Sequence, residues 1–153
     1  MERPSLYDFA GGAPAMYALA RATHERCLAD PVLEHPFSHD NLDPDHVQHL
    51  ADYWAEVLGG PATYSGSRGG HSYVLRIHAH QGMQADLGDR FVAAFVGGMD
   101  DAGLPADPEF RAAMRAYMEW AAAEVMSYDP PETAVPTGAP TPHWTWTGRV
   151  PAQ

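Results

Sequence analysis

A stretch without a sustained helical pattern runs from Leu58 to Met83 and separates two strongly periodic helical segments. The first segment ends at the Gly-Gly-Pro sequence of residues 59–61, and the second begins near Gln84. Loops longer than about 15 residues are uncommon in compact domains and are usually functional or disordered. This one holds aromatic, aliphatic and imidazole side chains: Tyr64, His71, Tyr73, Val74, Leu75, Ile77, His78 and His80. Disordered linkers are poor in apolar and aromatic residues, so we expect a structured loop that folds over a ligand.

Proline and glycine punctuate the rest of the chain. Proline in a first helical turn, preceded by a capping residue, predicts helix starts at the Asp-Pro pairs 30–31, 43–44 and 107–108 and at Pro14. Glycines predict helix ends at Gly59-Gly60 and at Gly103. We therefore expect helices at 4–9, 14–29, 44–58, 84–103 and 108–127, with a helical turn after Pro31. Strand alternation is confined to a few residues around 73–77, so the predicted fold class is all-α.

Length and charge exclude several classes of protein. A chain of 153 residues is expected to form one domain with a sizeable core. Its net charge of −11 argues against a nucleic-acid or anionic-membrane partner, and no apolar run approaches the ~20 residues of a membrane span. The N-terminal residues lack an apolar signal-peptide core, and the single cysteine, Cys27, suits a reducing compartment. We expect a cytoplasmic protein.

The chain changes character after residue 128. Six prolines between 129 and 153 rule out a packed helix there, so we expect a helical domain at 1–128 and a proline-rich tail at 129–153. Trp144 and Trp146 lie in this tail. The tail is either disordered or docked through these indoles onto the domain or a partner. Docking is favoured because exposed apolar clusters are uncommon.

Three histidines fall on or beside the predicted buried faces of helices. His24 belongs to the apolar stripe of 14–29, with Met16, Leu19, Ala20, Thr23, Cys27 and Leu28. His46 precedes Leu50 by one helical turn on the face that also carries Val47, Tyr53, Trp54, Val57 and Leu58, and His49 lies at its flank. His24 is either a core histidine bonded to the backbone or a functional residue. His46 and His49 either edge the core at the surface or face a cavity.

The last two helices carry a stripe of aromatic, aliphatic and methionine side chains: Phe91, Val92, Phe95, Val96, Met99, Phe110, Met114, Tyr117, Met118, Ala121 and Met126. Such a stripe is typical of a core, and it also suits the lining of a wide, flat cofactor. Several helices, a long loop with histidines among apolar residues and inward histidines elsewhere are what a haem requires. Its iron takes an imidazole on one side, and distal residues control binding on the other.

With these residues in view, the chain resembles the truncated haemoglobins, most closely group II, in the order of helices and loop over residues 5–127. The most specific motifs are Gly59-Gly60-Pro61-x-x-Tyr64, Gly70-His71 and Leu75-Arg76-Ile77-His78. Further matches are Gly11-Gly12 after a short first helix, and Asp30-Pro31-Val32-Leu33 followed by Phe37 and Leu42. The resemblance implies a truncated-globin 2-on-2 helical sandwich around haem b (iron protoporphyrin IX).

The resemblance also implies roles for individual residues. His78 matches the proximal ligand of the haem iron, whereas His80 falls where the family often has proline. Tyr64 and Arg76 match haem-contacting positions, and His49 matches a position near the haem propionates. On the distal side the matching residues are His24, Phe37, His46, Leu50 and Phe91, with His46 also counted among the haem contacts.

Three departures from the family pattern concern the ligand side and the proximal loop. His24 stands where the family commonly has tyrosine, and Phe91 stands where group II usually has a hydrogen-bonding tryptophan. Gln81-Gly82 replaces a pair that usually contains an aromatic residue. Because phenylalanine cannot donate a hydrogen bond, the expected distal donors are His24 and His46.

The expected function is reversible binding of O2, with NO, CO or peroxide as further ligands. Two inward imidazoles could slow oxygen release, act as an acid–base pair in NO dioxygenase-like or peroxidase-like chemistry, or ligate the iron directly. A reductase partner and a monomeric or homodimeric state are compatible with the sequence. One alternative is a non-haem bundle holding zinc or nickel through His46, His49 and His78 or His80. Another is a cofactor-free module that binds a partner through the tryptophan tail.

Overall fold

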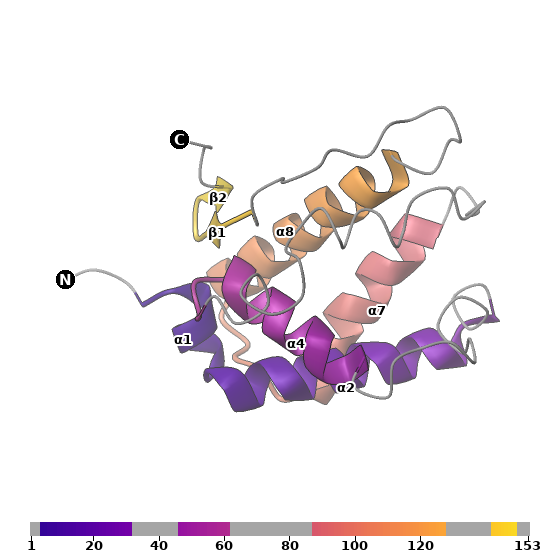
Figure 1. The fold of residues 1–153 in the computed structure, drawn as a ribbon, viewed down its shortest axis with the longest axis horizontal. Coiled ribbons are helices and arrows are strands. Elements are labelled where there is room, and N and C mark those ends of the chain that lie inside the picture. Colours follow the sequence, from indigo (N-terminus) through magenta and orange to yellow (C-terminus); the bar gives the residue numbers. More distant parts are fainter. Residues whose placement is uncertain (1–3, 32–45, 62–86, 128–141, 150–153) are drawn as a thin grey trace.

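The computed structural model describes residues 4–31, 46–61, 87–127 and 142–149 (Figure 1). Its helices are α1 (Leu6–Ala10), α2 (Ala13–Ala29), α4 (His46–Val57), α7 (Leu87–Asp101) and α8 (Pro108–Ser127). Two short strands, β1 (Trp144–Thr145) and β2 (Gly148–Arg149), pair antiparallel. The all-α prediction is confirmed for the body of the molecule. The hairpin was not predicted, because strands of two residues leave no alternation to detect.

Glycine sets the turn between α1 and α2. Ser5 caps α1 by accepting a hydrogen bond of 3.1 Å from the Asp8 amide. Gly11 and Gly12 then adopt φ angles of +122° and +78°, which side chains with a Cβ rarely tolerate. Pro14 lies in the first turn of α2, as predicted.

The turn between α7 and α8 also follows its sequence signals. Gly103 adopts a φ of +72° after the end of α7. The Asp107 carboxylate accepts a 2.9 Å hydrogen bond from the Phe110 amide, so Asp107 is the N-cap of α8, as predicted. Pro31 is helical directly after the break at Asp30, as its sequence signal predicted. Asp30 is also the C-cap of α2, and its carboxylate accepts hydrogen bonds from Arg90 of α7. The pair at 43–44 lies outside the described residues.

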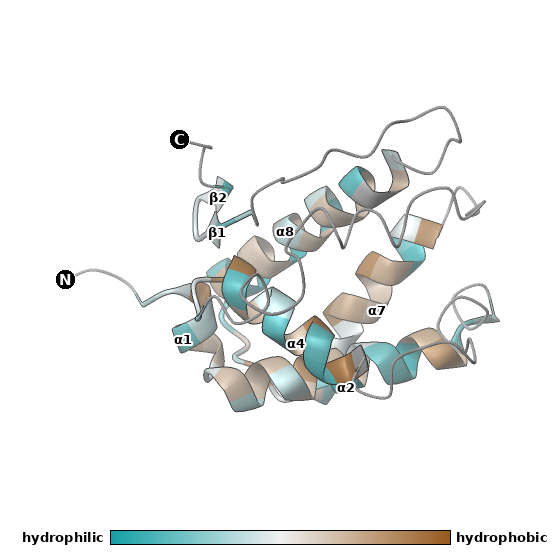
Figure 2. Cartoon of the chain, in the orientation of Figure 1, coloured by the Kyte–Doolittle hydropathy of each residue, from teal (hydrophilic) through white to brown (hydrophobic). Residues whose placement is uncertain are grey.

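The helices pack as two pairs around one apolar core. α2 contacts both α4 and α7, and α7 contacts α8. Hydrophilic and hydrophobic residues both occur along α4, whereas most of α7 is hydrophobic (Figure 2). Trp54 of α4 meets Phe95 of α7 edge to face, with ring centroids 5.0 Å apart. The largest fully buried side chains are Leu6, Met16, Leu19, Val57, Leu58, Phe95, Met99, Phe110, Met114 and Tyr117.

Several residues expected in the core lie at its margin instead. Leu28 is 37% exposed, so its assignment to the buried stripe of α2 was wrong. It directly follows fully buried Cys27, and the ~100° turn per helical residue carries it away from α4 and α7. Six others are only half-buried: Val47, Leu50, Phe91, Val96, Ala121 and Met126.

Backbones approach closely where α2 crosses α7. A Cβ built on Gly98 would lie 2.6 Å from Thr23 Oγ1 and 3.1 Å from the Thr23 backbone nitrogen. The preceding residue, Gly97, lies close to the guanidinium of Arg26, because a Cβ built there would overlap that group. Arg26 in turn donates to both carboxylate oxygens of Asp101, at 2.6 and 2.9 Å. Two glycines therefore permit a crossing that an ion pair then covers.

We expect Gly98→Ala to destabilise the fold by about 1–3 kcal/mol, because the added methyl must displace the backbone of α2. Gly88→Ala in the same helix is the matched control. There the new methyl meets only side chains at ordinary distances of 3.4 and 3.6 Å, to Met126 and Ala122. Alanine should be neutral or stabilising there, by up to about 1 kcal/mol. Urea unfolding of both variants measures the difference, and equal effects would contradict the close crossing.

The predicted stop at the Gly-Gly-Pro sequence is confirmed, and tertiary contacts reinforce it. Gly59 adopts a φ of +103°, and the Gly60 amide donates to the Ala55 carbonyl at 2.7 Å. A Cβ on Gly60 would lie 2.8 Å from that carbonyl oxygen and 2.8 Å from the Tyr7 ring. The Tyr7 amide donates to the Leu58 carbonyl at 2.9 Å. The end of α4 is thus fixed against α1.

Candidate functional site

Four of the predicted site residues have described side chains, and they come from three helices. His24 lies on α2, His49 and Leu50 on α4, and Phe91 on α7. For His46, which begins α4, only the helical position is described. Outside the described residues are Phe37, Tyr64, Arg76, His78 and the alternative ligand His80.

The described site residues share one kind of environment at the border of the core. His24, His49, Leu50 and Phe91 are all half-buried. Leu50 and Phe91 pack against the main core, and Phe91 also packs against the smaller cluster of Cys27 and Ala94. The contacts of α2 with α4 and α7 place these helices side by side. The prediction that they contribute to one region is therefore compatible with their packing.

Burial changes the chemistry of His24. Partial removal from water lowers the pKa of this imidazole, and nearby Glu25 opposes the shift more weakly. Desolvation acts this way because it disfavours the charged form. His24 is therefore neutral at pH 7, with one ring N–H donor and one nitrogen acceptor. A neutral donor at the border of an apolar core suits hydrogen bonding to a small uncharged ligand.

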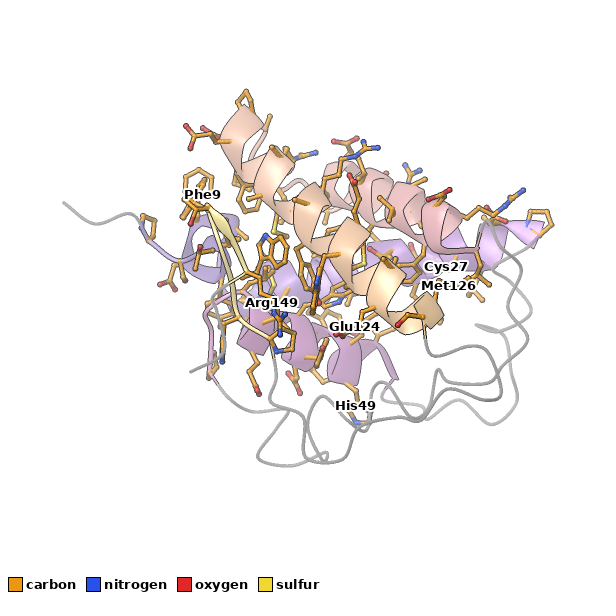
Figure 3. The ribbon with its side chains drawn as sticks, turned by 90° about the horizontal axis from the view of Figure 1, so that it is seen from above. Phe9, Cys27, His49, Glu124, Met126 and Arg149 are labelled. Atoms are coloured by element: carbon orange, nitrogen blue, oxygen red, sulfur yellow. The ribbon has the colours of Figure 1, made fainter. Side chains whose placement is uncertain are left out.

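His49 occupies the flank of α4, as its sequence position predicted. Figure 3 shows its side chain pointing from α4 away from α8. One turn away, Tyr53 and Trp54 of α4 are buried, at 7% and 2% exposed, and the buried residues of this helix begin at Ala51. His49 is therefore half-buried beside the core, and its Nε2 atom is buried.

Ion pairs between α2 and α7 border this region, and the sequence analysis missed them. Arg90, next to Phe91, lies 3.0 and 3.1 Å from the two carboxylate oxygens of Asp30. The Arg26–Asp101 pair lies further along the same two helices. A surface depression of about 400 Å³ lies between them. Its lining includes Arg26, Asp30 and Arg90, so it is open and charged where a haem requires an apolar slot.

The sequence analysis also missed a buried acid. Glu56 is 3% exposed and lies on the same helix as Leu50. Its place between Ala55 and Val57, which are equally buried, carries no polar periodicity that would single it out. A charged residue in the last turn of an amphipathic helix is usually assigned to the solvent face.

Of the histidines in the zinc or nickel alternative, only His49 has a described side chain. Leu50 and Phe91 are apolar and half-buried, and burial lowers the pKa of the His24 imidazole. Among the described residues, no three His, Cys, Asp or Glu side chains are grouped to hold a metal ion. A flat apolar cofactor with one polar contact is the ligand that such a border accommodates.

Comparison with known families decides the class of protein. The model of the bacterial-like globins matches residues 5–125, from the residue before α1 to the last turns of α8. The chain belongs to the bacterial-like globin family. Membership implies haem binding, and it removes the support for a non-haem metal bundle or a cofactor-free module.

Solved structures similar to this globin are truncated haemoglobins. A thermostable haemoglobin from Thermobifida fusca is 29% identical, with a TM-score of 0.69, and the similarity covers 84% of this chain and 100% of that chain. The group II truncated haemoglobin of Bacillus anthracis shares the fold, at 18% identity and a TM-score of 0.70 over 82% of this chain and 92% of that one. The predicted 2-on-2 truncated-globin fold is confirmed.

A curated relative of this globin is a group 1 truncated haemoglobin from Tetrahymena thermophila. It is 29% identical over 82 residues, which are 54% of this chain and 61% of that protein. The match thus spans less than two thirds of the relative's length.

No helix among the described residues is long and apolar enough to span a membrane.

Proposed function

We propose that this globin binds haem b and reversibly binds a small diatomic gas beside His24. O2 is the favoured ligand, with NO, CO and peroxide as further candidates. The observation that carries the proposal is the half-buried, neutral imidazole of His24 at the border of a globin core. The motifs around the long loop assign the protein to group II of the truncated haemoglobins.

His78 is the proposed proximal ligand of the haem iron. Its support is the Leu75-Arg76-Ile77-His78 motif at its spacing from Gly59-Gly60-Pro61. The end of α4, just before Gly59-Gly60-Pro61, is hydrogen-bonded to α1 through the Tyr7 amide and the Leu58 carbonyl. Tyr64, Arg76, His46 and His49 are proposed as further haem contacts.

Haem, when bound, supplies the iron that takes up the gas, and the side chains of this chain set how long the gas stays. His24 is proposed to donate a hydrogen bond to the ligand, and His46 to act as a second donor. Leu50, Phe91 and Phe37 are proposed to exclude water on the same side. Because Phe91 cannot donate, ligand retention depends on the histidines.

Turnover chemistry is a second candidate function, favoured by the neutral state of His24. Imidazoles can accept and return a proton because their ordinary pKa lies near neutrality, and burial lowers the pKa of His24. NO dioxygenase-like or peroxidase-like activity would use it in this way, with a reductase as electron source.

We propose a globin domain at 1–128 and a tail at 129–153, in a monomer or homodimer.

The absorption spectrum of the purified protein tests the haem proposal. We expect a Soret band in the protein as isolated or after adding hemin, because a globin core with a proximal histidine retains the cofactor. Reduction under O2 and under CO should then give two distinct, reversible spectra. A folded protein that stays colourless and cannot take up hemin would refute the proposal.

A further inference from the structure

The C-terminal hairpin lies across α1 and α8 (Figure 3). The Trp146 ring meets Phe9 of α1 edge to face, at a centroid distance of 5.0 Å. It also lies 6.2 Å from Phe110 of α8, and Phe9 and Phe110 are themselves 5.2 Å apart. The Trp146 indole N–H donates a 2.8 Å hydrogen bond to the Pro4 carbonyl. One side chain thus contacts both the start of the chain and α8.

The other indole anchors the hairpin on α8. Trp144 is only 8% exposed and packs against Tyr117 and Trp120, at centroid distances of 5.7 and 5.8 Å. Arg149 places its guanidinium 5.0 Å from the centre of the Trp120 ring. Aromatic pairs of this kind stabilise a fold beyond the area that they bury. The hairpin is therefore fixed to α8 independently of α1.

Neither the hairpin nor α1 is expected to be stable alone. The hairpin has two residue pairs, Trp144 with Arg149 and Thr145 with Gly148, and isolated two-stranded hairpins are at best marginal in water. α1 has five residues, and isolated helices shorter than about 12 residues are marginal. Each element depends on tertiary contacts, and they share the contacts of Trp146.

α1 also contacts the end of α4, so a contact that fixes α1 also restrains the end of α4. The Tyr7 amide donates to the Leu58 carbonyl, and the Tyr7 ring lies against Gly60. Gly59 approaches Ser5 so closely that a Cβ there would lie 2.6 Å from the Ser5 Cβ. Pro4, Ser5 and Tyr7 are neighbours in sequence. Contacts therefore run without interruption from Trp146, through α1, to the last turn of α4.

We propose that the C-terminal hairpin is a clamp that holds α1 against α8 and thereby fixes the end of α4. The family match stops at residue 125, so this clamp lies outside the shared globin region. It acts at the point from which the 58–83 stretch departs. The clamp rests on contacts among described residues and not on haem binding, so it stands or falls separately from the proposed function.

Hydrogen exchange followed by mass spectrometry tests the clamp on the full-length protein as purified. Trp146→Phe keeps an aromatic ring but removes the hydrogen bond to Pro4. It should speed exchange of the amides in 6–10 and 55–60 about fivefold, the ratio expected for one neutral hydrogen bond. Trp146→Ala also removes the ring contacts and should speed it by at least about tenfold. His143→Ala, at an exposed position of the same tail, is the matched control and should change nothing.

The distribution of the effect decides the outcome. Faster exchange confined to α1 and the end of α4, with α7 residues 87–101 unchanged, supports the clamp. An equal acceleration of α7, or no acceleration in 6–10 and 55–60, overturns it. If Trp146→Ala does not fold, Trp146→Phe decides alone, because it preserves most of the packed volume. Haem content is measured in parallel and does not enter the decision.

Discussion

His78→Ala is expected to abolish stable haem retention. The proposed proximal imidazole supplies the only bond from the protein to the iron that the gas does not compete for. Apolar contacts from residues such as Leu50 and Phe91 would remain and still favour a flat apolar guest. Loss of even an outer partner of a metal ligand weakens metal binding about 10–100-fold. Loss of the ligand itself should therefore speed haem release by at least about a hundredfold.

Haem transfer to an excess of an apo-globin acceptor measures this release, with the Soret absorbance as readout. His80→Ala is the matched control, since it removes the same side chain two positions further along the chain. His80→Ala should release haem at the wild-type rate. If His80→Ala loses haem and His78→Ala keeps it, the ligand assignment is reversed. If both keep haem, the proximal ligand lies outside this motif. Added imidazole should partly restore the spectrum of His78→Ala.

His24→Phe is expected to speed oxygen dissociation by about 10–100-fold. A hydrogen bond to a polar or charged acceptor contributes about 1.5–3 kcal/mol, which corresponds to this range. Phenylalanine keeps a ring at the border of the core but has no donor. Because His24 is half-buried and its pKa is lowered by burial, the wild-type donor is a neutral imidazole at pH 7.

Stopped-flow displacement of O2 by CO on the reduced protein measures the rate. His143→Phe makes the same substitution at an exposed position in the tail and should leave the rate unchanged. His46→Leu tests the second proposed donor and should also speed dissociation. An unchanged rate in both His24→Phe and His46→Leu would show that neither imidazole bonds the ligand. A rate altered only in His46→Leu would move the donor role from α2 to α4.

Local signals in the sequence predicted the helices well because their causes lie within a few residues. The Asp107 carboxylate caps α8 three residues away, and Gly103 ends the preceding segment by its own φ of +72°. Pro14 in the first turn of α2 is equally local. Asp30 shows where this logic ends, because its carboxylate is taken by Arg90, sixty residues further along the chain.

The candidate site was predictable only in part. Spacing placed His24, Leu50 and Phe91 on inward-facing positions, and the resemblance to truncated haemoglobins supplied their roles. Their half-burial could not be predicted, because it depends on where the core ends between α2, α4 and α7. All the site roles stay predictions, both for the residues with described side chains and for the others: His24, Phe37, His46, His49, Leu50, Tyr64, Arg76, His78 and Phe91. The contacts of the tail indoles also had no local signal that named their partners.

The sequence by itself determined the helical class, the approximate positions of the helices and the globin motifs, because helix periodicity, caps and glycine conformations are local properties of the chain. The first helix, expected at 4–9, lies at Leu6–Ala10, and the helix expected to end at 103 ends at Asp101. Only the tertiary structure decided which residues meet across long separations. It brought Gly98 against Thr23, paired Arg26 with Asp101, and joined Trp146 to Pro4. The physical reason is that such contacts depend on how whole helices pack. Steric repulsion and packing between residues far apart in the sequence affect the free energy of folding only when their backbones come within a few ångströms of each other.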